Sequence, residues 1–339
     1  MGEKEPSFMV GFRTYGLEAR DGTLMSLHVW YPSARPSRGS YSTKQGGWTL
    51  KAERNVKVAE ALFPIIVFSH DAAGYALFNH DVCSALAEAG FVVVAPTHGE
   101  DNLNSAPAML SAASCYHRPL ELIESLHFIA THADFKQRVD ATQVGVLGAG
   151  LGALSAMQLA GVDLDASGAE TYCAAMEERD QSFCNSWTRS RMRKMQGDLE
   201  EIRGRLGPDS FTPAFSGLKA VGLLAPGGLF MLDKKSLSAL QIPVAAVFAE
   251  QDAVYLPALD PDDVEYFFPR PLYESVSAMV LKGVDHYGAY AAAPADLRKT
   301  LPDLVSLSPK ESLEKGLKLR DAFLVNFFRS SLGAPQPKR

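Results

Sequence analysis

Two side chains that could move protons lie late in the chain, each just after an apolar run. Asp252 follows one run and His286 follows the next. An aspartate that hydrogen-bonds a histidine fixes its tautomer, and the imidazole can then transfer a proton near neutral pH. We therefore predict Asp252 and His286 to be a catalytic acid–base pair. Glu250 and Asp233 are the alternative acid partners.

A glycine-rich turn precedes both residues in the chain. The segment 144–157 is a short apolar run, then Gly148-Ala149-Gly150-Leu151-Gly152, then small and apolar residues at helical spacing. This pattern indicates a buried strand that breaks sharply into a helix. In the motif G-x-S-x-G such a turn presents a serine nucleophile. Here the nucleophile position would be Gly150, which has no side chain.

The same turn also has the spacing of the dinucleotide fingerprint G-x-G-x-x-G/A, at Gly148, Gly150 and Ala153. That site needs a second strand that ends in an acidic residue about 20 residues later. The segment 161–168 has acidic residues but no strand pattern. The sequence therefore favours the nucleophile turn over a nicotinamide or flavin site, and we expect no cofactor.

Apolar runs alternate with segments of helical or loop length along the chain. Continuous runs indicate strands buried on both faces of a parallel sheet, and the alternation indicates βαβ units. The runs are 64–69, 91–95, 144–147, 220–224, 244–248 and 278–281. We therefore predict a doubly wound, mostly parallel sheet that carries its site at the carboxyl ends of the strands.

Other segments complete this α/β prediction. Residues 9–18 and 24–31 alternate and predict an antiparallel pair at one edge, closed by Asp21-Gly22. The patterns also predict helices at 82–89, 120–131 and 313–332, and a long loop over 33–60.

One domain over residues 1–339 is expected, with an insertion at about 163–215. The insertion mixes basic and acidic residues between positions 189 and 205, which favours a solvated helix over an anion site. Because it follows the glycine turn directly, we interpret it as a helical lid.

The composition excludes several classes of partner and site. A net charge of -6 provides no basic field for nucleic acid. No apolar run is long enough to cross a membrane and no signal peptide is recognisable, so a cytoplasmic location is expected, although a chain trimmed at its start would look the same. No zinc spacing is found and no metal is expected. Cys173 and Cys184 would form a bridge in an exported protein and remain free thiols otherwise.

Short segments along nearly the whole chain occur in a distinctive order. They are Val10-Gly-Phe-Arg-Thr, Leu27-His-Val-Trp-Tyr-Pro32, Phe68-Ser-His70, Gly90-Phe-Val-Val-Val-Ala-Pro96-Thr-His98, Arg118-Pro119, Val144-Gly-Val-Leu-Gly148, Cys173 with Cys184, Leu224-Ala-Pro226, Asp252 and His286. In this order the chain resembles the dienelactone hydrolase group, which is related to platelet-activating factor acetylhydrolase-like esterases.

The resemblance implies the α/β-hydrolase fold with Asp252 and His286 as the triad acid and base. It also implies an oxyanion hole of backbone amides near Asp71, at Ala72 and Leu151. Pocket candidates are His70, Ala149 and His98, of which the two histidines are expected to orient loops.

The chain departs from this family at two places. The family has a histidine and a serine where this chain has Ala149 and Gly150, and a glycine where it has Asp71. Without the serine no acyl-enzyme can form. A carboxylate beside the oxyanion hole would oppose the negative charge that the hole stabilises. Both changes impair the same reaction, ester hydrolysis through an acyl-enzyme, which indicates that the chain has diverged from the family.

Three functions follow from these residues. The first is cofactor-free acid–base chemistry (cyclisation, elimination or isomerisation) on an ester- or lactone-like small molecule, with His286 as proton shuttle and Asp71 as a second acid or base. The second is an inactive fold kept as a binding module. The third is weak hydrolysis by water that His286 activates. Ser69 and Ser155 are weaker candidates for a substitute nucleophile, and the sequence does not indicate an oligomeric state.

Overall fold

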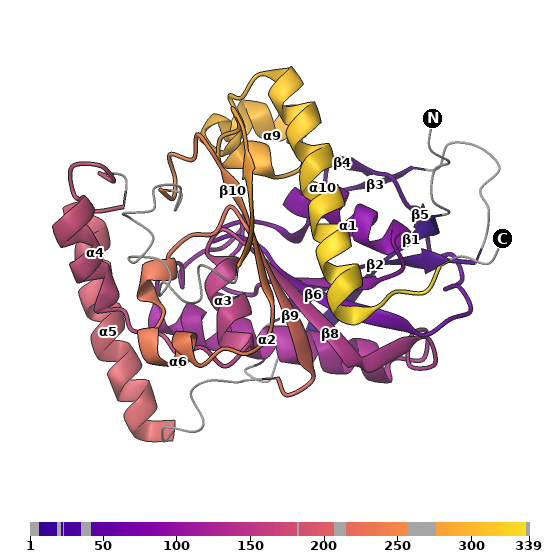
Figure 1. Cartoon of the computed structure of the whole chain (residues 1–339), viewed down its shortest axis with the longest axis horizontal. Helices are drawn as coiled ribbons and strands as arrows, with labels where there is room; N and C mark the ends of the chain where they lie inside the picture. Colours follow the sequence, from indigo (N-terminus) through magenta and orange to yellow (C-terminus); the bar gives the residue numbers. More distant parts are fainter. Residues whose placement is uncertain are drawn as a thin grey trace.

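The structure is a computed structural model that describes residues 7–18, 22, 24–34, 42–181, 183–206, 215–256 and 276–336. In this part of the chain a nine-stranded sheet has the order β11-β10-β9-β8-β6-β7-β2-β1-β5 (Figure 1). The strands are β1 (Met9–Glu18), β2 (Leu24–Ser33), β5 (Glu53–Arg54), β6 (Phe63–Ser69), β7 (Val92–Thr97), β8 (Val139–Ala149), β9 (Leu218–Leu224), β10 (Val244–Ala249) and β11 (Ser277–Leu281). From β11 to β7 all neighbours are parallel, whereas β2 runs antiparallel to β7 and to β1. The predicted mostly parallel sheet with an antiparallel N-terminal edge is confirmed.

All six predicted apolar runs are strands, and every residue of β6 is buried. The long loop predicted over 33–60 is wrong in part. It contains β5 and a separate hairpin of β3 (Thr43–Gln45) and β4 (Trp48–Leu50). These strands have two or three residues, too few for a period-two pattern to be recognised. Asp21 of the predicted turn lies outside the described residues.

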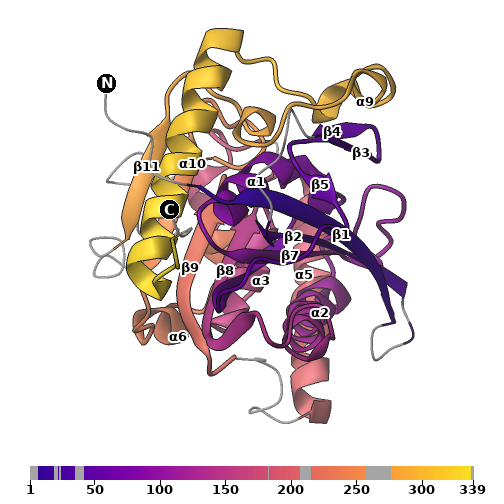
Figure 2. The same ribbon diagram turned by 90° about the vertical axis from the view of Figure 1, so that its right-hand side faces the viewer.

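Helices cover both faces of the sheet (Figures 1 and 2). The apolar residues of α1 and α10 belong to one core, and those of α2 and α3 belong to the other. The helices are α1 (His80–Glu88), α2 (Ala112–Thr131), α3 (Gly152–Leu159), α4 (Gly168–Met176), α5 (Ser186–Leu206), α6 (Lys234–Ser238), α9 (Ala295–Thr300) and α10 (Lys310–Leu332).

Helix α2 begins at Ala112, eight residues before the predicted start at position 120, and it contains Pro119. A proline has no N–H for the carbonyl four residues earlier. That carbonyl, of Cys115, instead accepts a hydrogen bond from Gln158 Nε2 on α3 at 2.9 Å. The packing of α3 on α2 therefore replaces the missing helical hydrogen bond.

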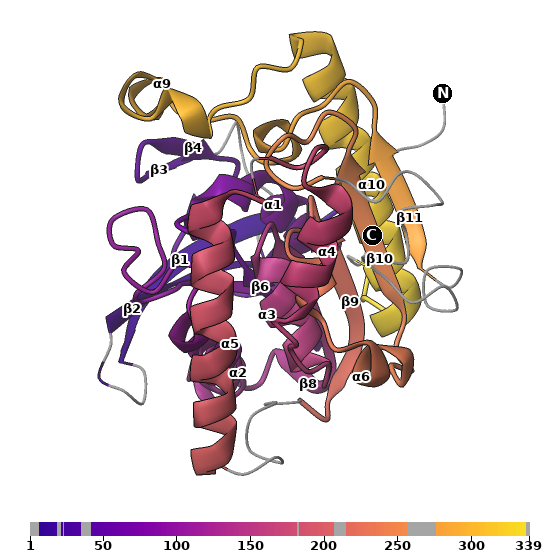
Figure 3. The ribbon, with the colours of Figure 1, turned by 90° about the vertical axis from the view of Figure 1, so that its left-hand side faces the viewer.

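The insertion after α3 folds into α4 and α5, and α5 lies along the outside of α2 (Figure 3). A disulfide joins Cys173 to Cys184, with a Cα–Cα distance of 5.3 Å. Of the two expected thiol states, the structure has the bridge, which is typical of oxidising compartments rather than of the cytoplasm. The lid role of the insertion and the cytoplasmic location remain predictions. None of the described helices has an apolar stretch long enough to pass through a lipid bilayer.

Candidate active site

Four loops at the carboxyl ends of strands in the parallel part of the sheet form the candidate site. Asp71 follows β6, Gly150 follows β8, Asp252 follows β10 and His286 follows β11. Because parallel strands end at the same edge of the sheet, Asp71 and His286 come into contact there although they lie 215 positions apart in the sequence.

His286 is almost fully buried and hydrogen-bonds Asp252, the predicted acid partner. The distance from His286 Nδ1 to Asp252 Oδ2 is 2.8 Å, and 1% of His286 is exposed. The other oxygen, Oδ1 of Asp252, accepts hydrogen bonds from the backbone N–H groups of Val254 and Tyr255 at 2.9 and 2.8 Å. Asp252 is therefore held on both oxygens and fixes the imidazole.

The two alternative acids bind elsewhere. Glu250 pairs with Lys282 at 2.7 Å on the surface, and Asp233 accepts a hydrogen bond from the backbone N–H of Ser236 at the start of α6. Neither is a partner of His286 in the described contacts.

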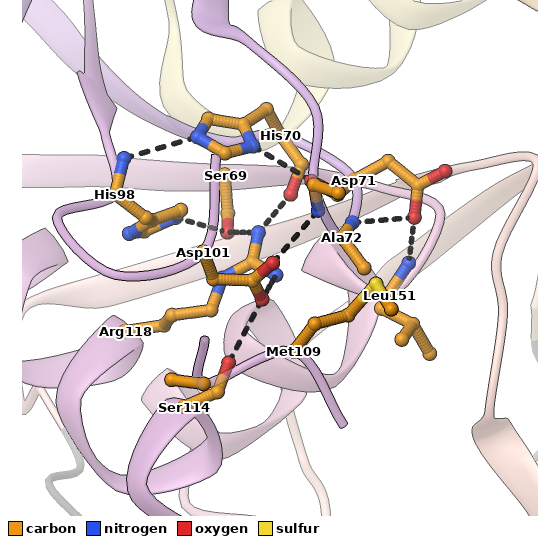
Figure 4. A network of polar contacts seen from close by, with 12 residues as sticks. Ser69, His70, Asp71, Ala72, His98, Asp101, Met109, Ser114, Arg118 and Leu151 are labelled. Atoms are coloured by element: carbon orange, nitrogen blue, oxygen red, sulfur yellow. Dashed lines mark hydrogen bonds and ion pairs between the residues drawn. The ribbon is translucent and has the colours of Figure 1, made fainter. Parts of the chain in front are cut away.

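The carboxylate of Asp71 occupies the position where an oxyanion could bind. Its Oδ1 accepts hydrogen bonds from the backbone N–H groups of Ala72 and Leu151, each at 2.8 Å (Figure 4). Its Oδ2 lies 3.0 Å from Nε2 of His286. Asp71 therefore binds the predicted amide pair and the imidazole at the same time.

Gly150 makes room for this carboxylate. Gly150 has a φ of +53°, and a Cβ atom added there would lie 2.0 Å from both Cγ and Oδ1 of Asp71. Its backbone is pinned to the sheet, because its N–H donates to the carbonyl of Leu224 at 3.0 Å. A side chain at position 150 and the observed position of Asp71 exclude each other.

The charges of the site stabilise one another. Burial alone would lower the pKa of His286, but the nearby Asp252 and Asp71 carboxylates raise it to about 9. Burial would raise the pKa of Asp71, but His286 and the amides of Leu151 and Ala72 outweigh burial and lower it. At neutral pH the resting site therefore holds an imidazolium at His286 beside the ionised carboxylate of Asp71.

Three tyrosines surround His286. The rings of Tyr255, Tyr287 and Tyr290 lie 5.1, 5.0 and 5.0 Å from the imidazole, centre to centre. The hydroxyl of Tyr290 is 2.9 Å from His286 Nε2, and the hydroxyl of Tyr255 donates to Asp71 Oδ1 at 3.2 Å. Sequence reasoning missed Tyr255 and Tyr290. They lie three residues after Asp252 and four after His286 in non-α-helical segments, where no periodic pattern predicts which group a side chain contacts.

A buried polar network holds the loop that carries Asp71 (Figure 4). Arg118 of α2 donates to the carbonyl of His70 and pairs with Asp101 at 3.1 Å. Asp101 in turn accepts hydrogen bonds from the N–H of Ala73 and the hydroxyl of Ser114, at 2.7 and 2.9 Å. The loop after β6 is thus tied to α2 through one ion pair.

Ser69, His70 and His98 belong to the same network. The backbone N–H of His98 donates to His70 Nε2 at 3.0 Å, so His70 Nδ1 donates to the carbonyl of Asp71 at 2.7 Å. His98 bridges Ser69 Oγ at 2.9 Å and Glu121 Oε2 at 2.5 Å. Burial, with the nearby Arg118 charge, places the pKa of both histidines well below the ordinary value. Both are therefore neutral at physiological pH and contact the loop rather than the Asp71 carboxylate.

The pocket candidates do not border the cavity that Tyr287 and Tyr290 help to line. That cavity has a volume of about 470 Å³. His70 and Ala149 are completely buried, and His98 borders a space of about 10 Å³. Ser155 on α3 is also buried. Within the described ranges, no three His, Cys, Asp or Glu residues are grouped so as to hold a metal ion.

The dinucleotide alternative does not fit the strand order. The strand after β8 is β9, which begins at position 218, whereas the residues about 20 positions after the turn lie in a loop and α4. The structure therefore has no strand to carry the acidic residue of that site within the described segment 153–181.

Comparisons with known proteins agree with this architecture. Residues 55–182 match the model of the dienelactone hydrolase family. A ferulic acid esterase from Streptomyces cinnamoneus superposes with a TM-score of 0.61 at 14% identity, over 99% of this chain and 94% of that one. A dienelactone hydrolase-like promiscuous phosphotriesterase from metagenomic libraries gives 0.54 at 13% identity, over 96% and 100%. No curated protein sequence matches the chain significantly. The chain thus has the α/β-hydrolase fold, and its residues 55–182 match the dienelactone hydrolase family.

Proposed function

We propose that the protein is a cofactor-independent enzyme whose chemistry is carried by Asp71, His286 and Asp252, with Gly150 at the position of the serine nucleophile. The observation that supports this most is the Asp71 carboxylate, which contacts both His286 Nε2 and the amide pair of Ala72 and Leu151. The family match of residues 55–182 supports an ester- or lactone-like small molecule as the substrate.

In this proposal His286 acts first as a proton donor. With a pKa of about 9 it is an imidazolium at neutral pH, and its Nε2 would protonate an oxygen atom of the substrate. Asp252 holds Nδ1 and stabilises the positive charge. Asp71 is the second charged group of the site. Such a pair suits cyclisation, elimination or isomerisation, none of which needs an acyl-enzyme.

Hydrolysis by activated water is less well supported. To take a proton from water, His286 must be neutral, and its raised pKa leaves few neutral molecules at physiological pH. A binding module is the second candidate, because Asp71 is only 7% exposed and its charge is already satisfied by protein groups. In that case the cavity of about 470 Å³ would hold a ligand that does not react.

The test is conversion of a panel of lactones and short esters by the wild type and by His286→Ala. We expect turnover without an acyl-enzyme burst, and a loss of at least about 100-fold in the variant. The triple variant Asp71→Gly, Ala149→His, Gly150→Ser should gain ester hydrolysis with a burst. An inert wild type that still binds ligands after His286→Ala would support the binding module, and a burst in the wild type would reveal a different nucleophile.

A further inference from the structure

The two oxygens of the Asp71 carboxylate have different surroundings. Oδ1 is held at 2.8 Å by each of two backbone N–H groups, those of Ala72 and Leu151, which do not titrate. Oδ2 faces His286 Nε2 at 3.0 Å and the hydroxyl of Tyr290 at 3.3 Å, and both groups can deliver a proton. One oxygen is therefore fixed, and the other lies beside proton donors.

We propose that Asp71 is a covalent nucleophile whose Oδ2 attacks a saturated carbon of an apolar epoxide. The resulting ester is then hydrolysed by water to release a diol. This inference rests on the proposed catalytic use of Asp71, His286 and Asp252 and goes beyond the proposed function, because it adds a covalent step and an epoxide substrate to the ester- and lactone-like molecules.

The hydrogen bonds of Oδ1 favour attack on a saturated carbon over attack on a carbonyl. A carbonyl under attack develops an oxyanion that needs donors, and the amides of Ala72 and Leu151 are already bound to Asp71. Attack on a saturated carbon creates no such oxyanion. When water later attacks Cγ of the ester, the oxyanion forms on Oδ1 itself, which already lies between those amides. The lowered pKa makes the Asp71 carboxylate a weakly basic nucleophile, and the opening of a strained ring does not require a strongly basic nucleophile.

The tyrosine hydroxyls favour an oxygen atom as the leaving group. Tyr255 and Tyr290 approach the carboxylate from Oδ1 and Oδ2, and both contact the imidazole with their rings. Burial, with the charge of Asp71, raises the pKa of both hydroxyls well above the ordinary value, so they remain donors. Tyr255 reaches this position because Gly227 has no side chain, since a Cβ there would lie 2.7 Å from the tyrosine ring.

The cavity beside Tyr290 has the size and lining for the apolar part of the substrate. Its volume is about 470 Å³, and its walls include Phe78, Tyr287, Tyr290, Leu297, Leu304 and Leu313. Tyr290 forms part of its wall while its hydroxyl contacts Asp71.

The first step conserves charge and protons. A lone pair of Oδ2 forms a bond to the epoxide carbon, the ring C–O bond breaks, and its electron pair passes to the ring oxygen. That oxygen takes a proton from Tyr290, which recovers one from the His286 imidazolium 2.9 Å away. Asp71 is then a neutral ester and His286 a neutral imidazole.

The second step regenerates the site. Loss of the Asp71 charge lowers the pKa of His286, so the imidazole can take a proton from water. The hydroxide attacks Cγ, and the tetrahedral centre collapses with cleavage of the Cγ–Oδ2 bond. The departing alkoxide takes the proton from His286 and leaves as a diol. The new Asp71 acid group returns its proton to His286, so one epoxide and one water give one diol.

The experiment uses the full chain and two probes, styrene oxide and 1,2-epoxyoctane. In a single turnover in oxygen-18 water with enzyme in excess, we expect unlabelled oxygen in the diol and the label in the peptide that contains Asp71. His286→Gln should accumulate an adduct of the mass of the epoxide on Asp71. Asp71→Asn should lower diol formation by at least about 1,000-fold, whereas the surface control Glu250→Gln should keep the wild-type rate.

Three results would overturn the inference and are distinguishable. Label in the first diol and none in Asp71 would mean direct attack by water, which removes the nucleophile but leaves a proton-donating His286. If the epoxides are not converted but lactones are, and the lactone conversion requires His286, the nucleophile role of Asp71 is likewise removed and the proton-donating role of His286 remains. If neither class is converted and no adduct forms, the proposed function fails as well. The isotope measurement needs only the wild type and so does not depend on how well the variants fold.

Discussion

At the scale of single residues, the site depends on a steric relation between Asp71 and Gly150. The carboxylate lies where a Cβ on residue 150 would stand, and it takes the hydrogen bonds of Ala72 and Leu151. Positions 71 and 150 are therefore coupled in physical terms, because the observed position of the carboxylate at 71 requires glycine at 150.

This coupling predicts the stability of serine variants. Gly150→Ser should lower the free energy of unfolding by at least about 3 kcal/mol, because the serine displaces a buried, paired carboxylate. The double variant Asp71→Gly, Gly150→Ser should recover most of this loss. Gly333→Ser is the matched control, since it has a similar φ of +67° but nothing within 4 Å of an added Cβ. Urea unfolding measures all three, and equal losses for Gly150→Ser alone and in the double variant would contradict the coupling.

The sequence predicted part of the site at this scale. Asp252 and His286 could be found because each follows an apolar run, so strand order alone brings them to one edge. The contacts of Asp71 could not be predicted, because they depend on the direction of the side chain within a loop. Tyr255 and Tyr290 were missed for the same reason, since their hydroxyls reach the carboxylate from loops on different strands.

At the scale of elements, the loop after β6 is held by α2 as well as by its own hydrogen bonds. Arg118 is 4% exposed and joins the carbonyl of His70 to Asp101, which also binds the N–H of Ala73. Helix α2 itself was predicted too short because Pro119 lies inside it, and the role of Arg118 was not foreseen. A buried ion pair links distant segments, and no local pattern signals which partner an arginine will find.

Removal of Arg118 should therefore loosen this loop. We expect Arg118→Met to lower the free energy of unfolding by about 3–5 kcal/mol, because Asp101 is left buried without its partner. Arg193→Met, at an exposed pair with Glu170, is the matched control and should cost less than about 1 kcal/mol. Urea unfolding of both variants measures these two losses in the free energy of unfolding. Similar small losses in the two would show that the buried pair does not hold the loop.

At the scale of the whole molecule, the parallel strands were predictable because six buried runs alternate with helices, whereas the short strands β3, β4 and β5 were not.

The charged centre determines how the stability of the folded protein responds to pH, because His286 binds a proton more tightly in the folded state than in the unfolded state. Its pKa is about 9 when folded and near the ordinary value of 6.5 when unfolded.

Stability should fall as the pH rises between these two values. Below pH 6.5 both states hold the proton, and the contribution of His286, on the order of 3 kcal/mol, is fully present. Above it the unfolded state releases the proton first, so the contribution declines and is lost as the pH passes 9. Urea unfolding at pH 6 and pH 9.5 measures the decline, which should be much smaller in His286→Gln. The exposed control His127→Gln should keep the wild-type decline, and an equal decline in all three proteins would contradict the assignment.

The central claim is that the Asp71 carboxylate takes the place of a nucleophile side chain and keeps His286 protonated. The most direct measurement is the titration of the His286 imidazole by NMR in the wild type, Asp71→Asn and Glu250→Gln. We predict a pKa of about 9 in the wild type and in Glu250→Gln, and a fall of about one unit or more in Asp71→Asn. A His286 pKa at or below 6.5 in the wild type, or one that does not respond to Asp71→Asn, would contradict the claim.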